Sequence, residues 1–411
     1  MRARLDLGII GGGTAGSAAA LFLSRAGHTV TVYERVLDPR PIGAGIMLQP
    51  TGLAVLSRLG LHDAIVGRGA RMAGLRVKTR RRVLTELDYA EIHPDLHAVG
   101  IHRGALFEHL FAAVQASTAR LVLGCPIEDL ARRRDKTALF TPPGREGGVE
   151  VGAHDLVIVA DGARSALRDD TTFGKEIRPY PWGALWFVGQ AGAHPYPDRL
   201  HQVVDGTSFL VGLLPTGFGP GHAEHPLLSL FYSLRCDRLD AFRKQGLTAW
   251  KDEVRAAVPE AAPLLDQITH QDQLLFSSYF DVEMPHWHED SVVYVGDAAH
   301  AMSPQLGQGA NLALYDAMVL SDCLSTLPPR EALAEYSRRR RAHLLFYRLA
   351  SRWLTPFFQS DHALLGDLRD LSFPIATALP FVRRQMILTM AGVQRNLFGR
   401  PLNLKVLSAK R

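Results

Sequence analysis

This sequence has few cysteines, no long uninterrupted apolar segment and no strong excess of one charge. Only 3 cysteines occur among 411 residues, and none form Cys-x-x-Cys pairs. This excludes a disulfide scaffold or a cysteine-based zinc site and favours a reducing compartment. Residues 7–24 carry no charge, but the consecutive glycines at their centre do not suit a spanning helix or a secretory segment. The net charge of +5 is too small to indicate a protein that binds nucleic acid. We therefore expect a cytoplasmic protein that contacts neither nucleic acid nor a membrane.

The composition is that of a globular protein, with 47% hydrophobic and 21% charged residues, and the length predicts two or three domains. Apolar runs over 5–10 and 29–34 predict buried parallel strands on either side of a helix over 14–25, which Gly27 ends. This unit predicts an α/β fold. Residues 155–160 and 291–295 repeat the buried-strand pattern. Residues 176–285 favour a second, mostly antiparallel sheet with a helix near 238–258.

A glycine motif follows the first predicted strand. Gly11 permits a tight turn, Gly13 lets a pyrophosphate approach the backbone, and Gly16 lets the helix pack on the strand. Glu34 ends the second strand, where a carboxylate accepts hydrogen bonds from ribose hydroxyls and favours FAD or NAD over NADP. We predict cofactor contacts from Gly11, Gly13, Thr14, Ala15, Gly16, Glu34 and Arg35.

Two further strand ends carry an acidic residue beside glycine. Asp161-Gly162 follows the strand over 155–160, and Gly296-Asp297 follows the strand over 291–295. The carboxyl ends of parallel strands are where ligands bind in such sheets. A glycine-rich loop then opens a helix over 309–324, whose first amides can stabilise negative charge. The predicted contacts here are Asp161, Gly296, Asp297, Pro304, Gly307, Gly309, Ala310 and Asn311.

In this order the three motifs resemble those of the class A flavoprotein monooxygenases, the family of para-hydroxybenzoate and salicylate hydroxylases. The resemblance extends to Arg103, matched to an arginine that contacts the FAD phosphates, and to residues 43–50, matched to the loop beside the flavin ring. It implies that NADH or NADPH reduces FAD, and that a flavin C4a-hydroperoxide hydroxylates an aromatic, phenolic or polyketide-like ring. No second Gly-x-Gly-x-x-Gly motif is present for the nicotinamide, which is consistent with transient binding of the reductant.

The resemblance implies a Rossmann-like FAD-binding domain of the GR2 type, a mostly antiparallel β-sheet substrate domain and a helical C-terminus. We expect the FAD-binding domain at 1–75, 98–175 and 285–330. The sheet domain would occupy 76–97 and 176–284. The helices of 331–411 would be interrupted by Pro356, Pro374 and Pro380.

The substrate would lie between the flavin and the second sheet. Catalytic candidates are His201 and Tyr232, as a base or relay, with Gln49 and Met47 as wall residues. A packed side chain is the simpler interpretation of each, and the aromatic residues Trp182, Trp186 and Phe187 fit a pocket or a core equally well.

Three alternatives remain open: a flavin-dependent halogenase, an isoprenoid-type flavin reductase and a non-catalytic flavin-binding subunit. The halogenase would need a lysine between flavin and substrate, and Lys78 is expected on a charged hairpin instead. The chain should be a monomer or a homodimer. His286 and His288 share a spacing that metal sites use, but no metal is predicted. The arginine runs 80–82, 132–134 and 338–341 are interpreted as solvated faces, although anionic ligands or a membrane surface would also suit them.

Overall fold

The computed structural model describes residues 4–221 and 224–405. Its first sheet has six strands in the order β18-β19-β12-β1-β2-β8, all parallel except β18. These strands are β1 (Asp6–Ile10), β2 (Thr29–Glu34), β8 (Arg120–Leu123), β12 (Leu156–Val159), β18 (His288–Glu289) and β19 (Val292–Tyr294). The predicted buried strands are therefore confirmed, and β12 and β19 are fully apolar because both faces of the sheet are covered.

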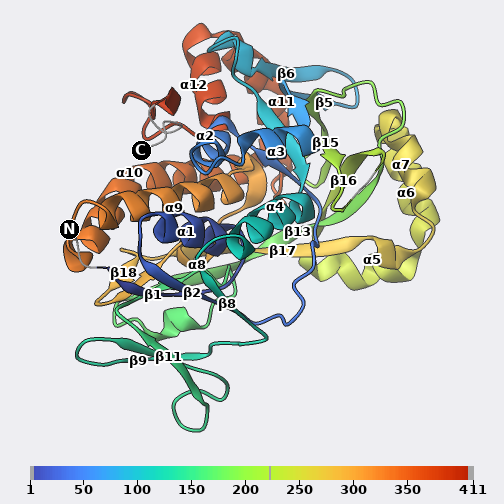
Figure 1. The fold of residues 1–411 in the computed structure, drawn as a ribbon. Helices are drawn as coiled ribbons and strands as arrows, with labels where there is room; N and C mark the ends of the chain where they lie inside the picture. The colour runs from blue at the N-terminus through green and yellow to red at the C-terminus, as the bar shows by residue number, and fades with distance from the viewer. Residues whose placement is uncertain (1–3, 222–223, 406–411) are drawn as a thin grey trace.

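Helices cover one face of this sheet, and a small antiparallel sheet lies on the other (Figure 1). The helices are α1 (Thr14–Arg25), α4 (Arg103–Gln115) and α9 (Gly309–Leu324), with α10 (Pro329–Leu354) packed on α9. The small sheet consists of β9 (Asp129–Arg132), β10 (Thr137–Phe140) and β11 (Glu150–His154). Gly27 adopts φ +90° just after α1, so the predicted helix end is confirmed.

The second large sheet has seven strands in the order β17-β13-β16-β15-β14-β5-β6. They are β5 (Gly74–Thr79), β6 (Val83–Asp88), β13 (Glu176–Gln190), β14 (Arg199–Asp205), β15 (Phe209–Phe218), β16 (Pro226–Arg235) and β17 (Leu275–Glu283). Only β5 and β14 pair in parallel, so the sheet is mostly antiparallel as predicted. It thus joins a hairpin from residues 74–88 to strands from 176–283. The domain boundaries drawn from the sequence remain a proposal.

The outer face of the seven-stranded sheet packs on α5 (Leu239–Gln245), α6 (Leu247–Ala257) and α7 (Ala262–Gln267). The single helix predicted near 238–258 is two helices, because Gly246 adopts φ +82° between them. The inner face meets the cofactor half through a three-stranded sheet of β3 (Gly45–Leu48), β4 (Ala70–Met72) and β7 (Ala98–His102). Helices α2 (Pro50–Arg58) and α3 (His62–Arg68) follow β3, and α8 (Asp297–His300) follows β19.

The C-terminal region contains α11 (Ala363–Ala378) and α12 (Pro380–Met390), beside the β5–β6 hairpin (Figure 1). Pro380 begins α12 as predicted, but the expectation that Pro374 interrupts a helix is wrong, because it lies inside α11. Proline cannot donate to the carbonyl four residues earlier. That carbonyl, of Asp370, instead accepts a hydrogen bond from Arg82 Nη2 at 2.6 Å. Residues 406–411 of the predicted helical region lie outside the described residues.

Candidate functional site

Two glycines of the turn after β1 are required by close packing, whereas the third borders an empty region. Gly11 adopts φ +99°, and a Cβ there would stand 2.6 Å from the Ala160 carbonyl oxygen. A Cβ on Gly16 would stand 1.8 Å from the Gly11 oxygen, so close packing requires both glycines. A Cβ on Gly13 would meet nothing within 4 Å. The first turn of α1 carries no acidic residue and no side-chain cap, so its amides face this opening and suit an anion.

Glu34 lies at the rim of the same turn. Its Oε2 accepts from the Gly12 amide at 2.8 Å and its Oε1 from the Val36 amide at 3.0 Å. Two backbone donors therefore fix the carboxylate beside the opening at Gly13. Arg35 next to it is exposed, Thr14 is half-buried and Ala15 is buried.

Asp161 lies against the glycine turn, because its Cα would be 3.0 Å from a Cβ on Gly11. Burial raises the pKa of the Asp161 carboxyl. Its Oδ1 is buried without a hydrogen-bond partner among the described residues. A buried acceptor without a donor is costly, so a ligand hydroxyl or amide at this position fits the site.

Arg168 joins this turn to the β19–α8 turn, a role that the sequence did not reveal. The side chain is buried, and its Nη1 donates to the Ala298 carbonyl at 3.0 Å while Nη2 donates to the Ala163 carbonyl at 2.7 Å. The guanidinium of Arg168 therefore connects the turn after β12 with the turn after β19. Asp297 itself is exposed, and a Cβ on Gly296 would stand 2.9 Å from that of Ala15.

A buried polar network supports the Gly296–Asp297 turn. Asp316 of α9 is fully buried and accepts from the Gly296 amide at 2.8 Å, from His300 Nε2 at 2.6 Å and from Arg340 Nε at 2.5 Å. Burial alone would raise the pKa of Asp316, but His300 and Arg340 outweigh it and hold the pKa well below its usual range. Arg340 also contacts His343 Nδ1 at 2.5 Å, whose Nε2 contacts the Gly392 carbonyl at 2.9 Å.

This network corrects the interpretation of residues 338–341 as a solvated face, because Arg340 is fully buried. The sequence gives one signal for it. Asp316 lies in the middle of α9, whose residues are nearly all apolar and buried, and a charged residue inside such a helix needs a partner.

Asn311, at the start of α9, forms hydrogen bonds that connect the glycine loop with the loop after β3. Its Nδ2 donates to the Met47 and Gly307 carbonyls, both at 3.1 Å, and its Oδ1 accepts from the Gln49 amide at 2.8 Å. The loop after β3 therefore lies against the glycine loop, where Pro304 and Gly309 are exposed and Ala310 is half-buried. Gln49 is buried, and its Oε1 accepts from the hydroxyl of Tyr89.

Arg103 begins α4 and lies across the loop before β3. Its amide donates to the Ala44 carbonyl at 2.9 Å, and Gly43 with φ +137° passes close to its side chain. The guanidinium is exposed. The same loop reaches the seven-stranded sheet, since the Gly45 amide donates to Ser229 Oγ at 2.9 Å. This loop therefore connects the predicted cofactor residues with the inner face of the seven-stranded sheet.

His201 and Tyr232 do not lie at this site. Tyr232 is one residue from Phe231 on β16 and faces outward, with its ring 5.8 Å from that of Trp250 on α6. His201 is buried on the same outer face, with Nε2 3.8 Å from Glu260 Oε1, and burial lowers its pKa to about 4. Because adjacent strand residues point to opposite faces, alternation alone did not reveal which face meets the cofactor. Their positions give no support to the predicted catalytic roles.

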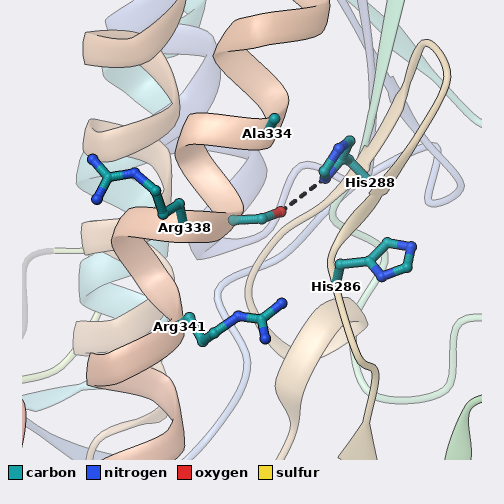
Figure 2. Close-up of a pocket in the computed structure, with 6 residues that line it drawn as sticks. His286, His288, Ala334, Arg338 and Arg341 are labelled. Atoms are coloured by element: carbon teal, nitrogen blue, oxygen red, sulfur yellow. Dashed lines mark hydrogen bonds between the residues drawn. The ribbon is translucent and has the colours of Figure 1, made fainter.

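A surface hollow of about 450 Å³ lies between α10 and the segment that leads into β18 (Figure 2). None of the predicted cofactor residues line it. His286, His288, Arg338 and Arg341 line it. His288 Nδ1 is engaged by Ser337 Oγ at 2.8 Å, and the two histidine rings are 5.8 Å apart. Within residues 4–221 and 224–405, no group of three or more potential metal ligands is found. In the part of the chain that the structure describes, no helix is both long and apolar enough to cross a membrane.

Comparison with known proteins agrees with this geometry. A family profile described as FAD binding domain matches residues 4–344. The 3-amino-4-hydroxybenzoate 2-monooxygenase PtmB3 of Streptomyces platensis is 30% identical over 392 residues, which cover 92% of this chain and 94% of that protein. A kynurenine 3-monooxygenase of Salinispora tropica is 29% identical, with 83% of this chain and 78% of that protein covered.

Among solved structures, Klebsiella pneumoniae HpxO complexed with FAD and uric acid superposes with a TM-score of 0.76 at 21% identity, covering 94% of this chain and 97% of that one. At this identity the likeness concerns the fold alone. The family match spans most of the chain, and it includes the glycine turn, the acidic strand ends and the start of α1. The chain therefore belongs to the class A FAD-dependent monooxygenases.

Proposed function

We propose that this monooxygenase hydroxylates a phenolic or polyketide-like aromatic ring in the cytoplasm, with FAD as its cofactor and NADH or NADPH as the reductant. The observation that carries the proposal is the match to an aminohydroxybenzoate monooxygenase over 92% of the chain, since it includes the sheet on which the substrate would lie. A relative named 6-methylpretetramide 4-monooxygenase, from Streptomyces rimosus, supports polycyclic as well as single-ring substrates.

The described residues suggest how FAD is held. Glu34 would accept from the ribose hydroxyls, and the first amides of α1 with the exposed Arg103 would hold the pyrophosphate. Asp297 and the unpartnered Oδ1 of Asp161 would accept from hydroxyl and amide donors further along. When bound, FAD supplies the activation of O2, and the protein supplies orientation and exclusion of water.

The substrate ring would lie between the loop after β3 and the inner face of the seven-stranded sheet. Phe231 follows Ser229 by two residues and so shares its face, which meets Gly45. Trp186 lies opposite Phe231 in the register, with ring centroids 5.2 Å apart, and both rings are half-buried. Met47 and Leu214 belong to one apolar cluster with residues of α12, which closes the region. Flat apolar walls of this kind suit an aromatic ring.

Gln49 would orient the substrate or the cofactor by a hydrogen bond. The Tyr89 hydroxyl donates to its Oε1, and burial raises the pKa of Tyr89, so that this hydroxyl keeps its proton. The amide nitrogen of Gln49 is thereby turned toward Gly307, where a Cβ would be 3.9 Å from it. We therefore assign Gln49 a donor role beside the glycine loop, and Met47 a wall role.

A halogenase is less well supported by these positions. Lys78, the lysine considered for that activity, pairs with Glu260 at 3.3 Å on the outer face of the sheet, together with His201. The relatives reported above carry monooxygenase names.

The test is a screen of aminohydroxybenzoates, other phenols and polycyclic phenols for faster NADH or NADPH consumption under air, with mass analysis of the product. We expect stimulated consumption and a product that gains one oxygen atom. A halogenated product formed only with added halide, or turnover that continues without O2, would refute hydroxylation.

A further inference from the structure

Helix α11 presents an apolar face outward and a charged residue inward. Leu364, Leu368, Leu371, Ile375 and, just beyond the helix, Leu379 are spaced by three or four residues and thus form one stripe. All are exposed, from 49% for Leu368 to 81% for Leu364. Arg369, in contrast, is fully buried. The usual amphipathic arrangement of a surface helix is therefore inverted.

Polar contacts fix this orientation. Arg369 Nη1 donates to the carbonyls of Gly206 and Phe357, each at 2.8 Å, and its guanidinium pairs with Asp370 at 2.6 Å. Gly366 packs closely on Gly206, because a Cβ there would be 3.0 Å from its backbone. Rotating the helix to bury the leucines would break the buried arginine contacts, so the stripe stays outward.

Exposed aromatic residues extend the apolar stripe at both sides. Trp353 at the end of α10 is 67% exposed and contacts Phe357, which in turn contacts Phe373 of α11. Phe381 of α12 stacks on Phe398, which is 88% exposed. Monomeric proteins rarely leave so large an apolar surface uncovered, so it marks a contact with another body.

The rim of this surface is positively charged. The β5–β6 turn carries the exposed Arg81 and Arg82, and Arg82 reaches α11 at the Asp370 carbonyl. Arg384 is exposed three residues after Phe381 and so lies on the same side of α12. Neither Arg81 nor Arg384 has an ion-pair partner among the described residues. Asp367 is the exposed acid on the outward face of α11, and it is outnumbered by these arginines.

We propose that α11 docks on an anionic phospholipid surface, with its leucines at the boundary of the acyl chains and the arginines on the headgroups. A helix of 16 residues with apolar residues on one side and basic residues around it matches a helix lying in the plane of a bilayer. A symmetric second copy would place the same positive rim against itself, whereas anionic headgroups neutralise it. α11, α12 and the β5–β6 hairpin gather at one end of the molecule, opposite β9 and β11, so this end can meet a flat surface (Figure 1).

This inference is independent of the proposed substrate, and it departs from the expectation that the chain contacts no membrane. That expectation depended on the lack of a long apolar run, whereas here the apolar residues are dispersed along a helix face.

The test is flotation of the FAD-loaded enzyme with vesicles of phosphatidylcholine alone or mixed with phosphatidylglycerol. We expect binding to the mixed vesicles, weakened by high salt. The variant Leu368→Gln/Leu371→Gln/Ile375→Gln should bind at least roughly tenfold less, because three apolar side chains no longer leave water. Arg81→Gln/Arg384→Gln should lose roughly fivefold for each arginine and lose the preference for phosphatidylglycerol.

The matched control is Val149→Gln/Leu275→Gln, which alters two exposed apolar residues outside the C-terminal helices and should bind as the parent does. Flavin content and melting temperature check that each variant is folded, and turnover without vesicles should not change. Absence of binding by the parent, or equal binding by the leucine variant, overturns the proposal. So does a dimer in light scattering that the leucine variant dissociates, because the stripe would then be covered by a second copy.

Discussion

Replacing Asp316 by asparagine should destabilise the protein and release its flavin. The two carboxylate oxygens receive only donors: Arg340 at one, the Gly296 amide and His300 at the other. An amide has a single oxygen, so its NH2 group must face at least one of these donors. Removing one partner of a buried ion pair costs about 3–5 kcal/mol, which is a large part of the total stability of a typical protein.

The effect on flavin follows because Gly296 precedes Asp297. When the asparagine oxygen turns to Arg340, the Gly296 amide loses its acceptor and no longer fixes the turn from which Asp297 would hold the cofactor. We expect Asp316→Asn to elute from gel filtration with little FAD and to melt well below the parent. Arg340→Met should behave similarly, and Asp316→Leu/Arg340→Met should cost less than the sum of the two, because no charge is then left buried alone.

The control is Glu335→Gln, which removes an ion pair with Arg338 and Arg339 at the surface of α10 and should cost no more than about 1 kcal/mol. Its flavin content should equal that of the parent. If Asp316→Asn retained its FAD and its melting temperature, the supporting role of this network would be wrong.

The other predictions concern the cofactor turn and one histidine. Gly13→Val should leave the apoprotein folded, since its Cβ meets nothing within 4 Å, but it should abolish flavin absorbance. Gly16→Val should give insoluble protein, because its Cβ would overlap the Gly11 oxygen. Intact FAD binding by Gly13→Val would contradict the turn assignment. Asp297→Ala should weaken FAD binding roughly ten- to hundredfold in a fluorescence titration, the usual effect of losing charge-assisted hydrogen bonds, with little change in apoprotein stability because the side chain is exposed. His201 takes up a proton near pH 6.5 when unfolded but only at about 4 when folded, so stability should be complete above pH 6.5 and fall by about 3 kcal/mol down to pH 4. His201→Phe should flatten that part of the urea-midpoint curve without lowering turnover, and an unchanged curve or a large loss of turnover would refute the placement of this residue.

Local sequence patterns were sufficient to predict the elements around the proposed cofactor site. The glycine turn, Glu34 and the helix over 309–324 each depend on a few consecutive residues, so periodicity and turn chemistry located them. Asn311 was placed at the site, but its bridge to Met47 and Gln49 joins residues more than 260 positions apart, which no local pattern reports.

The proposed substrate side could not be predicted from the sequence, because it depends on which face of the seven-stranded sheet meets the proposed cofactor site. Tyr232 and Phe231 are neighbours in the sequence but lie on opposite faces of the sheet, and Tyr232, which was selected for its chemistry, lies on the face that packs on α6. The arginine run 338–341 was misinterpreted for a similar reason, because three of its members are exposed and Arg340 alone is buried. The burial of Arg340 depends on its tertiary partner Asp316 in α9, which the run itself does not reveal.

The interleaved strand order affects how the chain is assembled during translation. β19 completes the parallel sheet beside β12 only after residue 294 has been synthesised, although β1 is made first. Until then, the nascent chain must leave the edge of β12 unpaired while the whole antiparallel sheet emerges from the ribosome. We therefore expect the cofactor to bind only after this strand has been made. A chain that ends before it should be colourless and prone to aggregation, because the edge of β12 stays unpaired.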